Sequence, residues 1–369
     1  MSSWLASVPA RIGPLDERAM AAARTRLDRL TKPPGSLGRL ESLAVQVAGI
    51  TGLDLPKLGH PAVVVFAADH GVAARGVSAY PSDVTAQMVT NFVRGGAAIN
   101  VLARLADATV VAVDAGVAGG IPGTDGPDGP DGPDGPAAST GARLVSARVA
   151  SGTRDMTVEP AMSRSEALAA IEVGRSIVAE LIADGRDLVA VGEMGIGNTT
   201  VASALAAVFT GRPASEVTGR GTGLDDAAVA LKIAVVESAL DRHRPDPADP
   251  LGVLAAIGGL EIAAVVGALL ACAESNVPVV LDGFITGAAA LVAAAIAPAT
   301  TARMIASHRS AEPGHRAVLE CLGLEPLLEL GMRLGEGSGA ALALPLVRAS
   351  TTVLAEMATF DSAGVSGPR

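Results

Sequence analysis

The sequence has 369 residues, 49% of them apolar, and its 28 Lys and Arg against 38 Asp and Glu give a formal charge of −10. This balance excludes a basic surface for nucleic acid or for an anionic membrane, and an aromatic content of 2% excludes stacking platforms for single-stranded nucleic acid. The length is enough for one large domain or for two unequal ones.

The sequence of residues 1–58 predicts helices. Its first residues predict a cytoplasmic protein. They begin with MSSWLASVPARIGPLDERA, which lacks the positively charged start and the long apolar run of a signal peptide. A Pro-Pro-Gly sequence beginning at Pro33 divides the residues that follow into two helices. The two cysteines, Cys272 and Cys321, share no metal-like spacing, so we expect neither zinc nor a disulfide, which fits a reducing compartment.

Residues 59–330 alternate short β-branched runs with Ala-rich stretches, which is typical of parallel strands joined by helices. Five runs predict strands, and each ends in a polar or glycine-rich segment: AVVVFAADHG, TVVAVDAG, LVAVGEMGIGNTT, VPVVLDGF and RMIASHRS. Because the carboxyl ends of parallel strands meet at one edge of a sheet, we expect these segments to form one site. The predicted fold class is α/β, a parallel Rossmann-like sheet flanked by helices. A smaller helical domain is expected from residues 1–58 together with the carboxyl-terminal segment 331–369.

The segments between the strands predict helices and one loop. SRSEALAAIEVGRSIVAELIADG predicts a helix capped by Ser163 or Ser165, and DDAAVALKIAVVESALDRH predicts a helix with acids at its start and a base at its end. The apolar stretch VLAAIGGLEIAAVVGALLACA, from Val253, contains Glu261 and a glycine pair, so we predict a buried helix and no membrane span. The Gly-Pro-Asp repeat at 123–140 predicts a solvated surface loop.

Two glycine-rich segments each carry one carboxylate, Glu193 in GEMGIGNTT and Glu336 in LGEGSGAAL. Neither has the spacing of a Walker A loop or of a dinucleotide fingerprint. Their N–H groups can hold an anion, but a glutamate would repel it. Both features are explained by a ligand with a phosphate at one end, held by N–H groups and Lys232, and a proton at the other end for a carboxylate to accept.

Simpler interpretations of these residues remain open at this point. The glutamates could cap the helices that follow them, and Lys232 could lie on a helix surface. His70 and His308 could be core or turn histidines with satisfied hydrogen bonds, and His315 is predicted to be a surface residue. A metal site built from Asp69, His70, Asp282 and His308 has no closely spaced ligand pair, and no G-x-S-x-G elbow of a serine hydrolase is present, so no metal is expected.

Several motifs taken together resemble the nicotinate-nucleotide–dimethylbenzimidazole phosphoribosyltransferase family. They run in order from Thr31 to Ala349: TKPPGSLGRLE, FAADHGV, YPSDVTAQMV, GEMGIGNTT, LDGFITGAAAL, SHRSAEPGH and RLGEGSGAALALPLVRA. The resemblance implies transfer of 5-phosphoribose from nicotinate mononucleotide to 5,6-dimethylbenzimidazole in the assembly of the cobalamin lower ligand. It also implies a homodimer, small-molecule substrates and no cofactor.

The resemblance assigns roles to individual residues. Glu336 would be the general base that takes the N–H proton of the benzimidazole, and Glu193 would lie near the ribose and the leaving nicotinate. Lys232 would contact the phosphate. The nucleotide pocket would be completed by Gly195, Asn198, Gly283, Phe284 and Ser307, and the benzimidazole wall by Tyr80, Gln87 and Met88.

Two alternatives to this function stay open from the sequence. The first keeps the fold and the donor but uses a different base or a phenol as the acceptor. The second is a nucleotide-binding protein without catalysis, which the presence of Glu336 disfavours.

Overall fold

A six-stranded parallel sheet lies at the centre of the protein, in the order β3-β2-β1-β4-β5-β6. The computed structural model describes residues 3–121, 141–221 and 223–366. All five predicted strands are confirmed: β1 (Pro61–Ala68), β2 (Thr109–Gly116), β4 (Leu188–Met194), β5 (Val279–Leu281) and β6 (Met304–Ala306). The order turns back between β1 and β4, because the chain builds outward from β1 to β3 on one side and from β4 to β6 on the other.

The sixth strand, β3 (Arg143–Ser146), was not predicted. It has four residues, lies at the edge of the sheet beside β2, and none of its side chains is fully buried, so it lacks the apolar run that marks the other strands. The Gly-Pro-Asp segment 123–140 lies outside the described residues.

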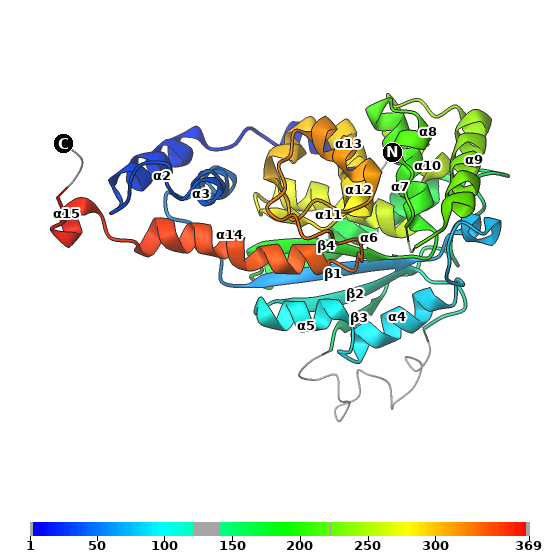
Figure 1. Cartoon of the computed structure of the whole chain (residues 1–369), viewed down its shortest axis with the longest axis horizontal. Helices are drawn as coiled ribbons and strands as arrows, with labels where there is room; N and C mark the ends of the chain where they lie inside the picture. The colour runs from blue at the N-terminus through cyan, green and yellow to red at the C-terminus, as the bar shows by residue number, and fades with distance from the viewer. Residues whose placement is uncertain (1–2, 122–140, 222, 367–369) are drawn as a thin grey trace.

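Helices cover both faces of the sheet, giving three layers (Figure 1). Successive side chains of β1 point to opposite faces of the sheet, so the core has two layers. Val64 and Phe66 pack into one layer, and Val63 and Val65 pack into the other. The first layer contains α1 (Ser3–Arg11), α6 (Arg164–Ala183), α7 (Asn198–Thr210), α8 (Ala214–Val217), α9 (Asp226–His243), α10 (Pro250–Ile257), α11 (Leu260–Glu274), α12 (Phe284–Ile296) and α13 (Pro313–Leu322). The second contains α3 (Arg39–Thr51), α4 (Val84–Val93), α5 (Ala98–Leu105) and α14 (Ser338–Glu356).

The predicted helix caps are confirmed, but the long apolar helix is not a single helix. Ser163 caps α6 and accepts the N–H of Glu166, and Asp225 caps α9. The stretch from Val253 forms two helices, α10 and α11, because Gly258 and Gly259 leave the helical conformation between them. Thirteen of the apolar and small residues of α11 and its Glu261 are buried, as expected for a core helix.

A separate helical cluster joins the two ends of the chain. Helix α2 (Glu17–Arg29) packs on α3 and on the last turns of α14 through Ala23, Leu27 and Leu354. Leu30 pairs with Thr359 in an isolated bridge just before α15 (Phe360–Ala363). Figure 1 shows α2, α3, α15 and the end of α14 side by side at one end of the molecule.

Two helices of this cluster, α3 and α14, also take part in the core at the sheet. The first half of α14, including Ala341 and Leu344, packs on the sheet, and one side of α3, with Leu43 and Val47, packs against α14 in the same apolar cluster. Helix α1 packs on α11 in the large core, where Trp4 donates its indole N–H to Glu274 at 2.8 Å. Residues 1–58 therefore contribute to both cores.

Helix α14 is, within the described part of the chain, the one helix long and apolar enough to cross a membrane. Of its most apolar window, 56% is buried inside this fold. The same helix packs on β4 and β5 and joins the two cores, so its apolar residues have partners within the protein.

Candidate active site

A cavity of about 360 Å³ lies at the carboxyl ends of the central strands, beside the point where the strand order turns back between β1 and β4. In sheets of this topology the switch point is where ligands bind. The wall is made of residues that follow β4, β5 and β6, together with α4 and the loop before α14. It is lined by Tyr80, Val84, Met88, Glu193, Met194, Gly195, Ile196, Asn198, Thr199, Gly221, Gly283, Phe284, Ile285, His308, Ser310, Glu312, Arg333, Leu334, Gly335 and Glu336.

Eight of the predicted residues line this cavity: Glu336, Glu193, Gly195, Asn198, Gly283, Phe284, Tyr80 and Met88. Three do not. Gln87 is exposed on α4, because one helical step turns its side chain away from the direction of Met88. The Ser307 hydroxyl lies behind the wall, where it donates to the Asp282 carbonyl at 2.8 Å and contacts His308 Nδ1. Lys232 reaches the site only through residues of the wall.

The two glutamates are brought together by close packing of their glycine turns. The backbone N–H of Glu336 donates to the carbonyl of Glu193 at 3.2 Å. A Cβ on Gly192 would lie 2.4 Å from the Gly337 nitrogen, and a Cβ on Gly335 would lie 2.7 Å from Glu193 Oε1. Only glycines permit this approach, so the pattern of glycines around each glutamate is explained by contact between the two turns.

Neither glutamate caps a helix. The N-caps of α7 and α14 are Gly197 and Gly337, without a side-chain cap from Glu193 or Glu336. Glu193 instead accepts a hydrogen bond from the Asn198 side chain, and Oε2 of Glu336 is buried without a partner.

Burial makes both carboxyls poor acids. Burial raises the pKa of Glu193 well above its ordinary value, and the nearby charges of Asp282 and Glu261 raise it further. Burial likewise raises the pKa of Glu336, against a hydrogen bond from the backbone N–H of Ile99. Carboxyl groups with raised pKa values can exchange protons near neutral pH, which is what a general base needs.

A buried cation lies behind the wall of the cavity at Thr199. Lys232 is fully buried, which overturns the alternative of a surface lysine, and its ammonium donates to Thr199 Oγ1 at 2.7 Å. Burial lowers the pKa of Lys232 to about 8, although the Glu312 carboxylate opposes the shift. Thr199 lies in the first turn of α7, so the lysine and the positive end of a helix dipole meet at one corner of the cavity.

Two residues of the wall were within quoted motifs but had been given no role. Glu312, in SHRSAEPGH, accepts the N–H of Gly221 at 2.8 Å, and its Oε2 is buried without a partner. Arg333, in RLGEGSG, donates to the Gly221 carbonyl at 2.8 Å. Their charged side chains within these motifs were the available signal. Their distance in sequence from Gly221 concealed the contact.

A layer of buried polar groups supports the floor. His70 Nε2 lies 2.6 Å from Glu261 Oε1, and both side chains are fully buried. A Cβ on Gly195 would lie 3.0 Å from the same histidine nitrogen, so the pair sits directly beneath that glycine. His315 was predicted at the surface and is buried instead, because its Nδ1 accepts the N–H of Ser310 in the wall.

No three His, Cys, Asp or Glu side chains of the described ranges gather in a way that would hold a metal ion. Three of the residues that the sequence analysis considered as metal ligands have other partners. Asp282 accepts backbone N–H groups, His70 pairs with Glu261, and His308 contacts Ser307.

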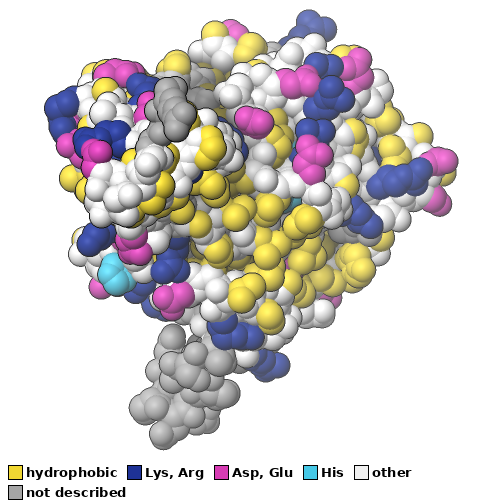
Figure 2. All heavy atoms as spheres, turned by 60° about the vertical axis from the view of Figure 1, so that its left-hand side comes forward, with side chains coloured by type: hydrophobic (Ala, Val, Ile, Leu, Met, Phe, Trp, Pro, Cys, Tyr) yellow, Lys and Arg dark blue, Asp and Glu magenta, His cyan; other side chains and the backbone are white. Residues whose placement is uncertain are grey.

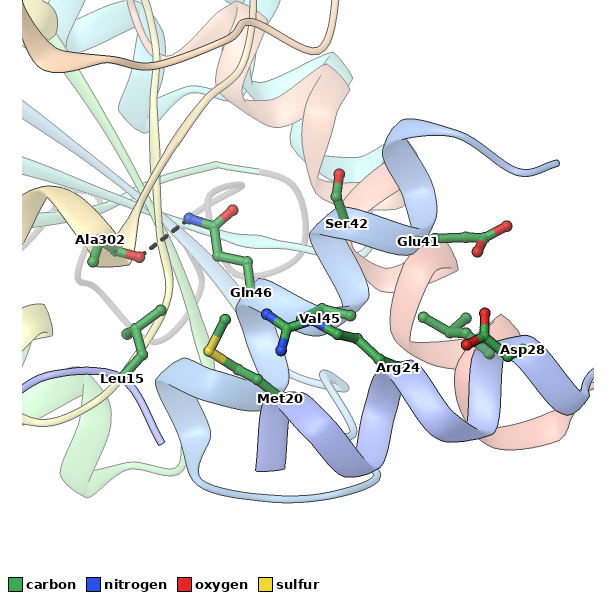
Figure 3. A pocket seen from close by; sticks show the side chains of 10 residues that line it. Leu15, Met20, Arg24, Asp28, Glu41, Ser42, Val45, Gln46 and Ala302 are labelled. Atoms are coloured by element: carbon green, nitrogen blue, oxygen red, sulfur yellow. Dashed lines mark hydrogen bonds between the residues drawn. The ribbon is translucent and has the colours of Figure 1, made fainter. Parts of the chain in front are cut away.

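A second hollow of about 580 Å³ lies between α2, α3 and the short η3 helix (Pro298–Arg303) (Figure 3). There the Gln46 amide donates to the Ala302 carbonyl at 3.1 Å. Because η3 immediately precedes β6, this hollow lies near an amino end of the sheet, away from the edge where ligands bind. Glu41 at its rim is paired with Lys32 at 2.7 Å.

The cavity thus combines two proton-accepting carboxyls with a phosphate-compatible corner. Comparisons with known proteins show which family the chain belongs to. A family described as phosphoribosyltransferase matches residues 12–365. The nicotinate-nucleotide–dimethylbenzimidazole phosphoribosyltransferase of Roseiflexus sp. is 56% identical over 365 residues, which is 99% of both chains. The enzyme of the same name from Chloroflexus aurantiacus is 59% identical over 96% of this chain and 97% of its own.

The fold agrees with a solved relative as well. The crystal structure of nicotinate-nucleotide–dimethylbenzimidazole phosphoribosyltransferase from Thermus thermophilus matches with a TM-score of 0.86 at 46% identity. The match covers 96% of this chain and 100% of that one. The chain therefore belongs to the nicotinate-nucleotide–dimethylbenzimidazole phosphoribosyltransferase family.

Proposed function

We propose that this protein transfers 5-phosphoribose from nicotinate mononucleotide to 5,6-dimethylbenzimidazole, giving nicotinate and α-ribazole 5′-phosphate for the cobalamin lower ligand. One observation carries the proposal: two glutamates from separate glycine turns, Glu193 and Glu336, line one cavity whose wall at Thr199 is backed by the buried Lys232. Both of the reactants that such a reaction brings together, an anionic nucleotide and a neutral azole, find matching groups there.

The nucleotide phosphate is assigned to the corner of Thr199 and Lys232. The hydroxyl of Thr199 and the α7 N-terminus supply donors, and the ammonium of Lys232 supplies a charge. Arg333 adds a second cation to the cavity wall. One phosphate needs no more than this, which is consistent with the acidic balance of the chain as a whole.

Glu336 is assigned as the general base. As one ring nitrogen of the benzimidazole attacks the anomeric carbon, the bond from that carbon to the nicotinate nitrogen breaks and its electron pair neutralises the pyridinium. The proton on the other benzimidazole nitrogen passes to Glu336. Attack on the face opposite the leaving group inverts the anomeric carbon and gives the α product.

Glu193 is assigned to the ribosyl group. The transition state carries positive charge on the ribose, and negative charge or a carboxyl dipole near it is stabilising in a site closed to water. The Asn198 amide fixes the Glu193 carboxyl by a direct hydrogen bond. Tyr80 and Met88 are assigned to the acceptor wall, since both line the cavity on the side of α4.

The first experiment is incubation of the purified protein with nicotinate mononucleotide, with and without 5,6-dimethylbenzimidazole and without added metal. We expect the release of nicotinate, measured by chromatography, to depend on the benzimidazole. Other bases and phenols tested in parallel would define the acceptor range. A folded protein that releases no nicotinate with any acceptor would contradict the proposal and leave a nucleotide-binding protein without catalysis.

The same assay tests Glu336. We expect Glu336→Gln to lower kcat by about 10²–10⁴-fold, the usual contribution of a general base, while nucleotide binding is retained. Glu329→Gln is the control, because Glu329 is 61% exposed and pairs at the surface with Arg309. Near-normal turnover of Glu336→Gln would transfer the role of base to Glu193.

We further propose a cytoplasmic homodimer. Free thiols at the buried Cys272 and the exposed Cys321 fit a reducing compartment. Exposed apolar side chains on α5 and in the loop before α14 support an interface between two copies. The division into 1–58, 59–330 and 331–369 remains our proposal for domain organisation, with α3 and α14 as the connecting helices.

A further inference from the structure

The N-terminus of α14 is already occupied by a carboxylate of the chain itself. Asp282 follows β5 and is 1% exposed. Its Oδ1 accepts the N–H groups of Gly339 at 2.7 Å and Ala340 at 3.0 Å, and its Oδ2 accepts the N–H of Gly337 at 3.2 Å. The donors that the sequence suggested for a ligand phosphate are therefore used internally, and β5 is tied to the turn that carries Glu336.

That turn has an unusual backbone. Gly335, Glu336 and Gly337 are three consecutive left-handed residues, with φ of 85°, 64° and 84°. The other non-glycine residues of positive φ in the described chain are Asp107, Arg244 and Asn276. Each follows the end of a helix, where this conformation is common. Glu336 instead precedes a helix. A left-handed glutamate costs roughly 1–2 kcal/mol, so surrounding contacts must hold it.

Hydrogen bonds add to the close packing of this turn on Gly192. The Glu336 N–H bonds to the Glu193 carbonyl, and the Ser338 hydroxyl donates to the Gly335 carbonyl at 2.8 Å. Asp282 provides three more bonds, and these are the ones that fix where α14 begins. A carboxylate at a helix N-terminus also gains from the helix dipole.

We propose that Asp282 is a positioning residue of the reaction, whose carboxylate holds the left-handed turn so that Glu336 faces the N–H of the acceptor. The proposal rests on the role assigned to Glu336 above. The simpler alternative is that Asp282 only stabilises the fold as a helix cap. The two differ in what they predict for catalysis, because a cap does not affect proton removal selectively.

The groups that face Asp282 give a second signature. Glu193 from β4, Glu336 from the turn and His308 after β6 lie around it. Burial raises the pKa of Asp282 to about 7, with the three N–H groups opposing the shift. After burial itself, the Asp282 charge is the largest cause of the raised pKa of Glu193. The charges of Asp282 and Glu336 also repel each other, so a neutral side chain at 282 should let the base Glu336 ionise at lower pH and move the acidic limb of the pH–rate profile to lower pH.

The test compares Asp282→Asn with Asp114→Asn in the nicotinate-release assay. Asp114 is a matched control. It lies near the end of β2, is 2% exposed, accepts the N–H of Val117 at 2.8 Å, pairs with Arg148 at 2.8 Å and does not line the cavity. For Asp282→Asn we expect kcat to fall about 100-fold, as a misplacement of about 1 Å can produce, with the KM for the nucleotide within about threefold of normal. For Asp114→Asn we expect a lower denaturation midpoint but unchanged kcat and pH profile.

A series of acceptors separates positioning of the base from general damage. An azole with a more acidic N–H depends less on the base, so the loss in Asp282→Asn should shrink along such a series, as it should in Glu336→Gln. Ser338→Ala is a milder second variant, because it removes one bond to the turn and keeps a small residue; it should show the same trend with a smaller loss, even if Asp282→Asn does not fold.

The outcomes are distinct. A loss in Asp282→Asn and Ser338→Ala that shrinks with acceptor acidity supports the proposal. A loss that is equal to that of Asp114→Asn, or that ignores acceptor acidity, overturns it and leaves Asp282 as a helix cap. If Glu336→Gln itself keeps normal turnover, the assigned base is wrong and the inference falls with it. If only Glu336→Gln loses turnover, Glu336 remains the assigned base and only the role proposed for Asp282 is wrong.

Discussion

At the scale of single residues, the chemistry was visible in the sequence but the contacts were not. Glu193 and Glu336 were recognisable because a carboxylate in a glycine-rich turn contradicts a simple phosphate loop. The reason for the glycines emerged only from the packing of one turn on the other at Gly192 and Gly335. Asp282 showed only as a polar strand end and as a member of a rejected metal site, because its bonds to α14 join residues 55 to 58 positions apart.

Lys232 provides a prediction of pH dependence. Its pKa is lowered to about 8 by burial, so the free enzyme holds a charged lysine below pH 8 and loses that charge as the pH rises through this value. The KM for nicotinate mononucleotide should therefore rise above pH 8. Lys232→Gln should show a KM raised by about 10–100-fold, equivalent to a charged hydrogen bond, that no longer changes between about pH 7 and 9.

The control for this prediction is Lys57→Gln, since Lys57 is an exposed lysine outside the cavity. Steady-state kinetics at a series of pH values would measure all three proteins. If Lys232→Gln keeps the same dependence on pH as the unmodified protein, another group titrates and Lys232 does not bind the phosphate.

At the scale of elements, five strands were predictable because each is a buried apolar run with a clear end. The edge strand β3 was not, since its side chains are only partly buried. The glycine pair signalled the break between α10 and α11. Because the whole stretch is apolar, we predicted one helix there. The contact between α6 and α11 could not be predicted at all. Glycines within helices have several possible causes, and the sequence does not say which helices meet.

The crossing of α6 and α11 gives a stability prediction. A Cβ on Gly174 would lie 1.7 Å from the Ala264 carbonyl oxygen, and a Cβ on Gly267 would lie 1.8 Å from that of Ile171. In an isolated helix, Gly→Ala stabilises by about 1 kcal/mol. Here the added methyl group meets backbone, so Gly267→Ala should lower the free energy of unfolding by about 3 kcal/mol or more.

Denaturant unfolding followed by circular dichroism would measure this change. Gly13→Ala is the control, because nothing lies within 4 Å of the methyl group it would add. It should leave the midpoint nearly unchanged. A Gly267→Ala protein as stable as the control would mean that the two helices can separate without cost, and that the close crossing does not define the core.

At the scale of the whole molecule, the sequence suggested a small helical domain made from both chain ends. In the described structure α14 runs from the sheet to the α2–α3 cluster and takes part in both cores, while α1 packs in the large core, so the domain division stays a proposal. Helix α14 also begins beside Glu336. A continuous helix therefore connects the terminal cluster with the active-site turn, and sequence alone could not show this because one apolar helix can belong to either core.

The surface supports the proposed homodimer. Figure 2 shows hydrophobic side chains gathered over the centre of one face of the molecule. Among the exposed large apolar residues, Val101 and Leu105 belong to α5, with 53% and 75% exposed, and Leu330 and Leu334 lie in the loop before α14. Helices α5 and α14 contact each other. Apolar side chains gathered on one face of a protein are typical of an interface.

Analytical ultracentrifugation tests this proposal. We expect the unmodified protein to sediment as a dimer, since a stable interface buries about 800 Å² on each partner and apolar area supplies most of the free energy. The double variant Val101→Asp, Leu105→Asp should sediment as a monomer, because association would bury two carboxylates per chain in an apolar interface. Val158→Asp, at an apolar residue of similar exposure (49%) outside α5 and the loop before α14, should stay dimeric. An unmodified protein that remains monomeric at high concentration would contradict the homodimer. A dimeric double variant would place the interface on another face.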